Sequence, residues 1–263
     1  MDDRFGRDFA YRRLQPSILL TDASIPHVIW GQDAVEYNFG ALFMYYVSLD
    51  LQILLSPSMI QKAVELLAPS YCPMTVDEID AEEAAPKNSV RLDYTIAFRD
   101  RPNDFTRLKS TQCNTLADPS HVLLIANTIF NYPLDDIVHV SLPLCPELPF
   151  PSVPAIVRLM PVHAAKWMDA DYTPQSSSFL LACETLLECA IESSFAKEVD
   201  EVYASNDQLP ARLKDMIVDL DEHQKCWVYE CFHIGVEMGE SSSDSDADMF
   251  SLLANVDSHR SRL

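Results

Sequence analysis

Only five of the 263 residues are glycine, and this shortage restricts how the chain can fold around phosphate groups. Average usage of about 7% would give roughly 18 glycines. Phosphate-binding loops of the P-loop and dinucleotide-binding kinds need clustered glycines, because backbone amides must approach the anion. No such cluster follows an apolar run here, and no G-x-S-x-G nucleophile motif occurs. These observations exclude several common nucleotide-binding and hydrolase folds.

The apolar patterns of the first quarter of the chain alternate between strand and helix periods. Residues 25–30 are β-rich and end at Gly31, and alternation around Asp50 and Gln52 is typical of a half-buried strand. The predicted elements are a strand over 25–30, a helix over 32–40, a strand over 47–53 and a helix over 58–67. This order predicts an α/β (α+β) fold with a small mixed sheet and flanking helices.

Later segments extend this prediction toward a helical C-terminal portion. We expect a strand over 90–98, a helix over 119–130, a strand over 136–145, a rigid proline-rich connector over 146–154, and helices beyond it. The predicted domain organisation is an extended lead-in (1–24), an α/β core (25–155), a helical portion packed on the core (156–239) and a disordered acidic tail (240–263).

Charge and cysteine usage bear on partners and location. Acidic residues outnumber basic ones by 40 to 19, so the chain lacks the cations that sequence-independent DNA or RNA binding requires. Its acidity fits either solubility or a basic partner. Seven scattered cysteines indicate reduced thiols, and neither a secretory signal nor a long apolar run is present. We therefore expect a cytoplasmic or nuclear protein without a membrane span.

Residues 25–55 resemble the nucleotidyltransferase superfamily of the polymerase-β type. Members of that family have a strand ending in a glycine turn, then a helix, then a strand with two carboxylates in a D-x-D motif. Side chains two residues apart on a strand share a face, so two acids can hold Mg²⁺ against nucleotide phosphates. In this chain the pair is Asp50 and Gln52, and Asp93 stands where the family's third acid could lie.

The resemblance implies a site and also shows where this chain departs from the family. Gly31 and Gln32 occupy the turn that holds the triphosphate in the family, and Ser48 and Gln52 complete the expected ligand-binding residues. A neutral glutamine replaces one carboxylate, and a bulky amide replaces the small second turn residue. The resemblance covers residues 25–170, and a group of uncharacterised fungal proteins shares the W-G-x-D-A helix between two strands.

Three functions remain open from the sequence. The first is a non-catalytic nucleotidyltransferase-like module that binds a protein or a small ligand and needs no cofactor. The second is an active nucleotidyltransferase that uses Mg²⁺ on Asp50 and Asp93 to transfer a nucleoside monophosphate. The third is a regulatory protein acting through its tail, where Ser241, Ser243 and Ser245 each precede an aspartate by three residues, a pattern that acidophilic kinases recognise. An idle solvated tail is the plain alternative.

Overall fold

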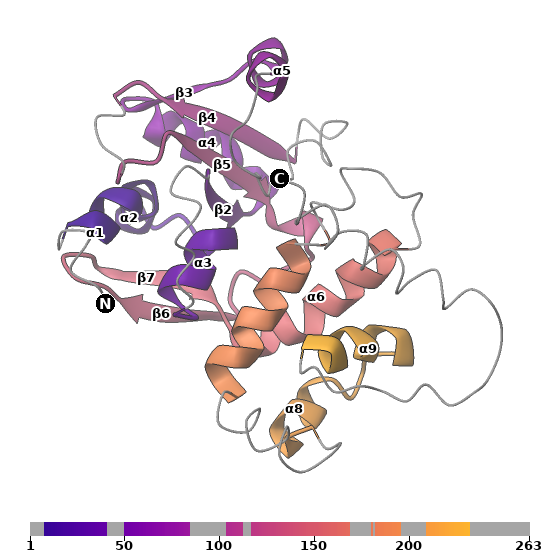
Figure 1. Ribbon diagram of the computed structural model, residues 1–263. Coiled ribbons are helices and arrows are strands. Elements are labelled where there is room, and N and C mark those ends of the chain that lie inside the picture. Colours follow the sequence, from indigo (N-terminus) through magenta and orange to yellow (C-terminus); the bar gives the residue numbers. More distant parts are fainter. Residues whose placement is uncertain are drawn as a thin grey trace, which may run out of the picture.

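A five-stranded mixed sheet lies at the centre of the protein, with helices around it and a helical C-terminal portion (Figure 1). The computed structural model describes residues 8–40, 50–84, 104–112, 117–168, 180, 182–195 and 209–231. The strand order is β1-β2-β5-β4-β3, and only the β2–β5 pair is parallel among these strands. The strands are β1 (His27–Trp30), β2 (Leu51–Leu55), β3 (Tyr71–Pro73), β4 (Phe105–Ser110) and β5 (His121–Ala126).

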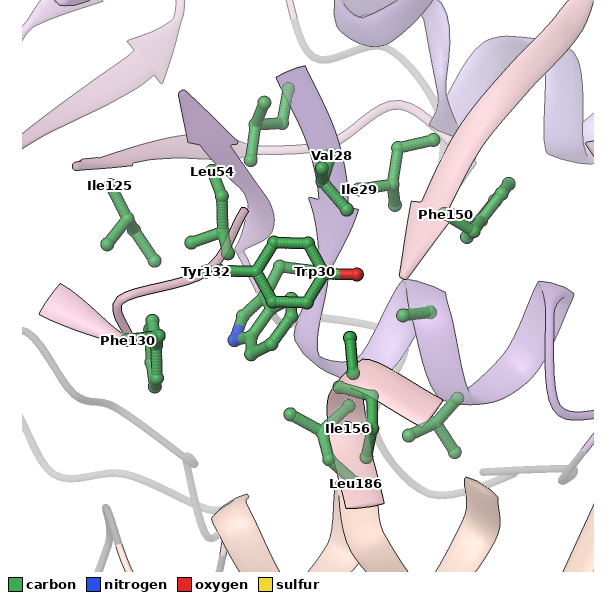
Figure 2. Close-up of a cluster of buried hydrophobic side chains, with 14 of the residues drawn as sticks. Val28, Ile29, Trp30, Leu54, Ile125, Phe130, Tyr132, Phe150, Ile156 and Leu186 are labelled. Carbon is green, nitrogen blue, oxygen red and sulfur yellow. The ribbon is translucent and has the colours of Figure 1, made fainter. Parts of the chain in front are cut away.

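Every residue of β2 and β5 is buried, so the prediction of a half-buried strand around Gln52 was wrong. Two helices, α2 (Gln15–Asp22) and α4 (Pro57–Leu67), contact each other and the strands on one face. The other face carries an aromatic cluster in which the Trp30 ring centroid lies 5.0 Å from Phe130 and 5.1 Å from Tyr132 (Figure 2). Strands covered on both faces read as continuous apolar runs.

The N-terminal segment is helical where the sequence predicted an extended lead-in, and that prediction was wrong for residues 9–22. Helix α1 (Phe9–Arg13) is followed after one residue by α2, whose Pro16 lies in the first turn. Proline is tolerated there because the first amides of a helix have no partner within it. The buried face of α2 explains its stability, since Ser17, Ile18 and Leu20 pack into the core.

The predicted helix over 119–130 was also wrong, since this segment forms β5 and a short 3₁₀ turn, η2 (Asn127–Ile129). A short apolar run fits a buried strand as well as a helix, and pairing to β2 and β4 decided between them. The predicted helices over 32–40 and 58–67 are confirmed as α3 (Gly31–Tyr37) and α4, while the predicted strand over 90–98 lies outside the described residues.

The proline-rich segment is a strand rather than a connector. β6 (Ile137–Ser141) pairs antiparallel with β7 (Glu147–Pro151), and prolines are accepted because β7 is an edge strand of a two-stranded sheet. β7 also contacts β1, which places the hairpin beside the main sheet. An acidic helix, α5 (Val76–Ala84), precedes a part of the chain that is not described; its capping box joins Thr75 and Glu78.

The helical C-terminal portion is confirmed. It contains α6 (Val153–Met168), a helix over residues 182–195, α8 (Ala211–Met216) and α9 (Glu222–Cys231). Ile156 from α6 and Leu186 from the next helix reach the aromatic cluster around Trp30 (Figure 2). This portion therefore shares one core with the sheet. No helix among the described residues has the length and apolar character that crossing a bilayer requires.

Candidate functional site

The predicted site lies at one end of the strands, where β1 ends and where β2 and β5 begin. Trp30 pairs directly with Gln52, so the Gly31 turn and the start of β2 are neighbours. The parallel register pairs Leu51 with Val122, which puts the preceding residues Asp50 and His121 beside each other. His121 Nδ1 lies 3.6 Å from Asp50 Oδ1. The fold thus brings together Gly31, Asp50 and Gln52, as the sequence predicted.

The contact between Gly31 and Gln52 depends on glycine. Gly31 has a φ of +62°, a left-handed conformation that costs other residues strain. A β-carbon there would lie only 2.6 Å from Oε1 of Gln52. The Gln52 amide therefore fills the space against the turn. Its side chain is buried, and its Oε1 accepts no hydrogen bond from the described residues.

Asp50 is paired with an arginine that the sequence analysis did not identify. Arg107 on β4 places Nε 2.8 Å from Oδ2 of Asp50 and Nη2 3.2 Å from Oδ1. The Arg107 side chain is fully buried and that of Asp50 is 10% exposed. Arg107 reaches Asp50 because Gln52, Leu123 and Arg107 stand in one row across three strands, and residues in such a row share a face.

A second buried ion pair joins α1 to α3, the helix that follows β1. Arg13 on α1 donates from Nε and Nη2 to the two carboxylate oxygens of Asp33 on α3, at 2.8 and 2.9 Å. Burial alone would lower the pKa of Arg13, but the charge and hydrogen bonds of Asp33 outweigh it and the pKa is raised; the charge of Asp50 adds to this. Arg13 therefore lies near both aspartates.

We define the Asp50 cluster as Arg13, Asp33, Asp50, Gln52, Arg107 and His121. Its two guanidinium groups balance its two carboxylates, and each arginine is hydrogen-bonded to an aspartate. A divalent cation needs several anionic or carbonyl oxygens facing one point. Both oxygens of Asp50 face Arg107 instead, and the neighbouring position offers a neutral amide. These residues do not fit Mg²⁺.

The remaining predicted site residues are either beside the cluster or outside the described parts of the chain. Gln32 follows Gly31 in α3, and its Oε1 is buried without a hydrogen-bond partner among the described residues. Ser48, Asp93 and the tail serines (Ser241, Ser243 and Ser245) lie outside those residues. In the described ranges, no three His, Cys, Asp or Glu side chains are grouped to hold a metal ion.

Sequence reasoning missed four members of the cluster: Arg13, Asp33, Arg107 and His121. Asp33 could have been found from the sequence, because this residue belongs to the W-G-Q-D-A motif. Arg107 carries no local signal, because its contact with Asp50 depends on the order and register of β2, β5 and β4. Arg13 was overlooked because the N-terminal segment was expected to be extended.

A buried serine–histidine pair elsewhere has the residue types of a catalytic dyad but is sealed. His27 donates from Nδ1 to the carbonyl of Ile25 at 2.8 Å, so its Nε2 accepts from Ser17 Oγ at 2.7 Å. Burial lowers the pKa of His27 to about 4, which keeps the ring neutral. Ser17 is fully buried, so no substrate reaches it. The pair fastens α2 to β1.

The described residues thus define an α+β protein with a helix-flanked mixed sheet and a buried, charge-balanced polar cluster at one sheet edge. No protein-family model matches the sequence, and no curated protein matches it. Among solved structures, the chain is similar to the antibiotic-resistance factor ANT(2'')-Ia, at 13% identity and a TM-score of 0.33, over 77% of this chain and 100% of that one. A likeness of this size carries no inference about function.

Proposed function

We propose that this protein is a non-catalytic, nucleotidyltransferase-like module that acts by binding a protein or a small ligand. Two features support the kinship: the sequence resemblance over residues 25–55, and the observed strand, Gly31 turn, helix and second strand at one sheet edge. The contacts of Asp50, Gln52 and Gly31 support the absence of catalysis.

The pairing of Asp50 with Arg107 is the observation that carries the proposal. A cation bound to Asp50 would have to displace the Arg107 guanidinium, which is fully buried on the neighbouring strands. Leaving a buried charge without its partner costs several kcal/mol, on the order of 3–5 in measured cases. In the family a metal ion lies beside this carboxylate, so the pairing with Arg107 argues against metal-dependent catalysis at Asp50.

The Gly31 turn supports the same conclusion. In the family this turn holds the triphosphate, which needs open space beside the glycine. Here the Gln52 amide fills that space, since even a β-carbon on Gly31 would meet Oε1 at 2.6 Å. A triphosphate at this turn would have to push the amide aside. Both halves of the family's nucleotide site are therefore closed by side chains of this chain.

Thermal unfolding with and without nucleotide tests the proposal. Wild type is heated with Mg²⁺ alone and with Mg²⁺ plus each of the four common nucleoside triphosphates, beside Asp50→Asn and the control Asp215→Asn, which changes an exposed acid on α8. We expect no nucleotide-dependent rise in Tm for wild type. A rise that Asp50→Asn abolishes and Asp215→Asn retains would contradict the proposal and favour Mg²⁺-dependent transfer through Asp50 and Asp93.

A further inference from the structure

Helix α1 is attached to the protein in a different way from its neighbour α2. Of its five residues only Ala10 and Arg13 are buried, and Tyr11 is among the exposed large side chains. The longer α2 buries Pro16, Ser17, Ile18 and Leu20. Helices in proteins owe most of their stability to a packed apolar face, and the buried apolar residues of α1 are fewer than those of α2. Polar contacts therefore have a larger share in holding α1 than in holding α2.

Two consecutive arginines provide that attachment. Arg12 donates from Nε and Nη2 to the carboxylate of Asp118, at 3.0 and 2.8 Å, and Arg13 forms the equivalent fork with Asp33. Asp33 lies in α3 and belongs to the Asp50 cluster, and Asp118 lies three residues before His121, the first residue of β5. One fork thus joins α1 directly to the cluster, and the other joins it to the segment that leads into His121.

The junction between α1 and α2 allows α1 to move as a unit. Leu14 alone separates the two helices, with a φ of −97° and a ψ of 9°, and it is fully buried. Pro16 has no amide hydrogen, so one of the backbone bonds that would join a continuous helix is missing here. Buried Leu14 and the packed face of α2 fix the hinge, while Arg12 and Arg13 tie α1 to Asp118 and Asp33.

We propose that α1 is a latch over the Asp50 cluster, and that a ligand reaches this cluster only when the Arg12–Asp118 fork has opened. The inference rests on the proposed function, since it specifies how access to that same site is controlled. The outer fork is the release point because Arg12 and Asp118 are 36% and 20% exposed, whereas the Arg13–Asp33 pair is buried. Exposed ion pairs are weak and screened by salt, so this fork opens first.

Hydrogen exchange read by mass spectrometry tests whether α1 is a separate latch. The full chain is compared with Asp118→Asn and with Arg12→Gln, which break the outer fork from either side. Glu222→Gln is the matched control, because it breaks an exposed pair with Lys225 on α9. We expect exchange in residues 9–14 to rise about fivefold in both fork variants, as for loss of a partly exposed pair, with α2 unchanged.

Two results of that experiment would overturn the latch. Unchanged exchange in residues 9–14 in both variants would show that the fork does not hold α1. Equal loosening of α1 and α2 would show that the two helices open together, so that α1 is no separate element. The Glu222→Gln control must leave residues 9–14 as in wild type.

Histidine modification by diethyl pyrocarbonate tests whether the latch covers the cluster. His121 pairs with Asp50 and is 6% exposed. Buried His27, which contacts Ser17, and buried His163, which contacts the Phe130 carbonyl, serve as internal controls. We expect His121 to react about fivefold faster in the fork variants, in proportion to the opening of α1, with His27 and His163 unchanged. An unchanged His121 beside faster exchange in α1 would overturn the gating role.

These measurements use no ligand and no nucleotide, so they fail or succeed independently of the proposed function. A nucleotide-dependent rise in Tm would end the non-catalytic proposal and leave the latch standing. Failure of the latch would leave the proposed binding function standing, without control of access to the Asp50 cluster by α1.

Discussion

Two polar networks in this protein each contain an arginine paired with an aspartate, but these pairs are buried in one network and exposed to solvent in the other. The Asp50 cluster pairs Arg13 with Asp33 and Arg107 with Asp50 in the interior. The second network contains Tyr132, Asp136, Ser152 and Arg158. There Ser152 Oγ donates to Asp136 and accepts from the amide of Ala155, and the Tyr132 hydroxyl accepts from the Ser152 amide. It begins α6 and fastens it to the end of β7.

The two networks differ in burial of their ion pairs and in the groups that they contact. The second network satisfies backbone groups that the fold itself leaves open, and its Arg158–Asp136 pair remains 47% and 31% exposed. In the Asp50 cluster each arginine pairs with an aspartate, and the Gln52 Oε1 has no partner among the described residues. Burying charged groups is costly, and such cost is typical of functional sites.

Replacing Arg107 should produce the largest effect and sharpen this comparison. Arg107→Met leaves the Asp50 carboxylate buried without its cation, and we expect the free energy of unfolding to fall by about 3–5 kcal/mol. Urea denaturation measures the change. The double variant Asp50→Leu/Arg107→Met removes both charges and should recover most of the loss, because apolar replacement of a buried pair is often neutral. A loss below about 1 kcal/mol would make the cluster equivalent to a surface pair.

Lowering the pH should produce the next largest loss of stability, because a buried histidine that is neutral and has no ion pair must then take up a proton. His27 has a folded pKa of about 4, below its ordinary value of 6.5. Its contribution to stability is therefore complete above pH 6.5 and is lost as the pH falls toward 4, by about 3 kcal/mol in all. Urea denaturation at a series of pH values measures this slope. If His27→Gln keeps the same slope, another group is responsible.

Breaking the exposed pair of the second network should produce the smallest effect. Arg158→Ala removes a half-exposed cation from Asp136, and screening by water limits the expected loss to about 0.5–1 kcal/mol. The change in Tm, with Lys225→Ala on α9 as the control for an exposed pair, measures it. A loss of stability as large as that of Arg107→Met would contradict the comparison, because burial of the ion pair would then not explain how the two networks differ in stability.

The sequence by itself determined the elements whose signals are local. The β-rich run before Gly31, the helical spacing over 58–67 and the long C-terminal helices all carry the period of the structure that they form. The pairing of the Gly31 turn with Asp50 and Gln52 was also predictable, because a strand, a turn, a helix and a second strand return the chain to the same edge. These features depend on residues close in sequence.

Only the tertiary structure decided the character of the site. Arg107 meets Asp50 because β5 is inserted between β2 and β4, and Arg13 meets Asp33 because the fold brings α1 next to α3. The segment that becomes β5 fits a helix or a strand until its neighbours cover both faces. Ion pairs between residues 57 or 20 positions apart leave no periodic pattern, since their energy comes from the burial and geometry that the assembled sheet provides.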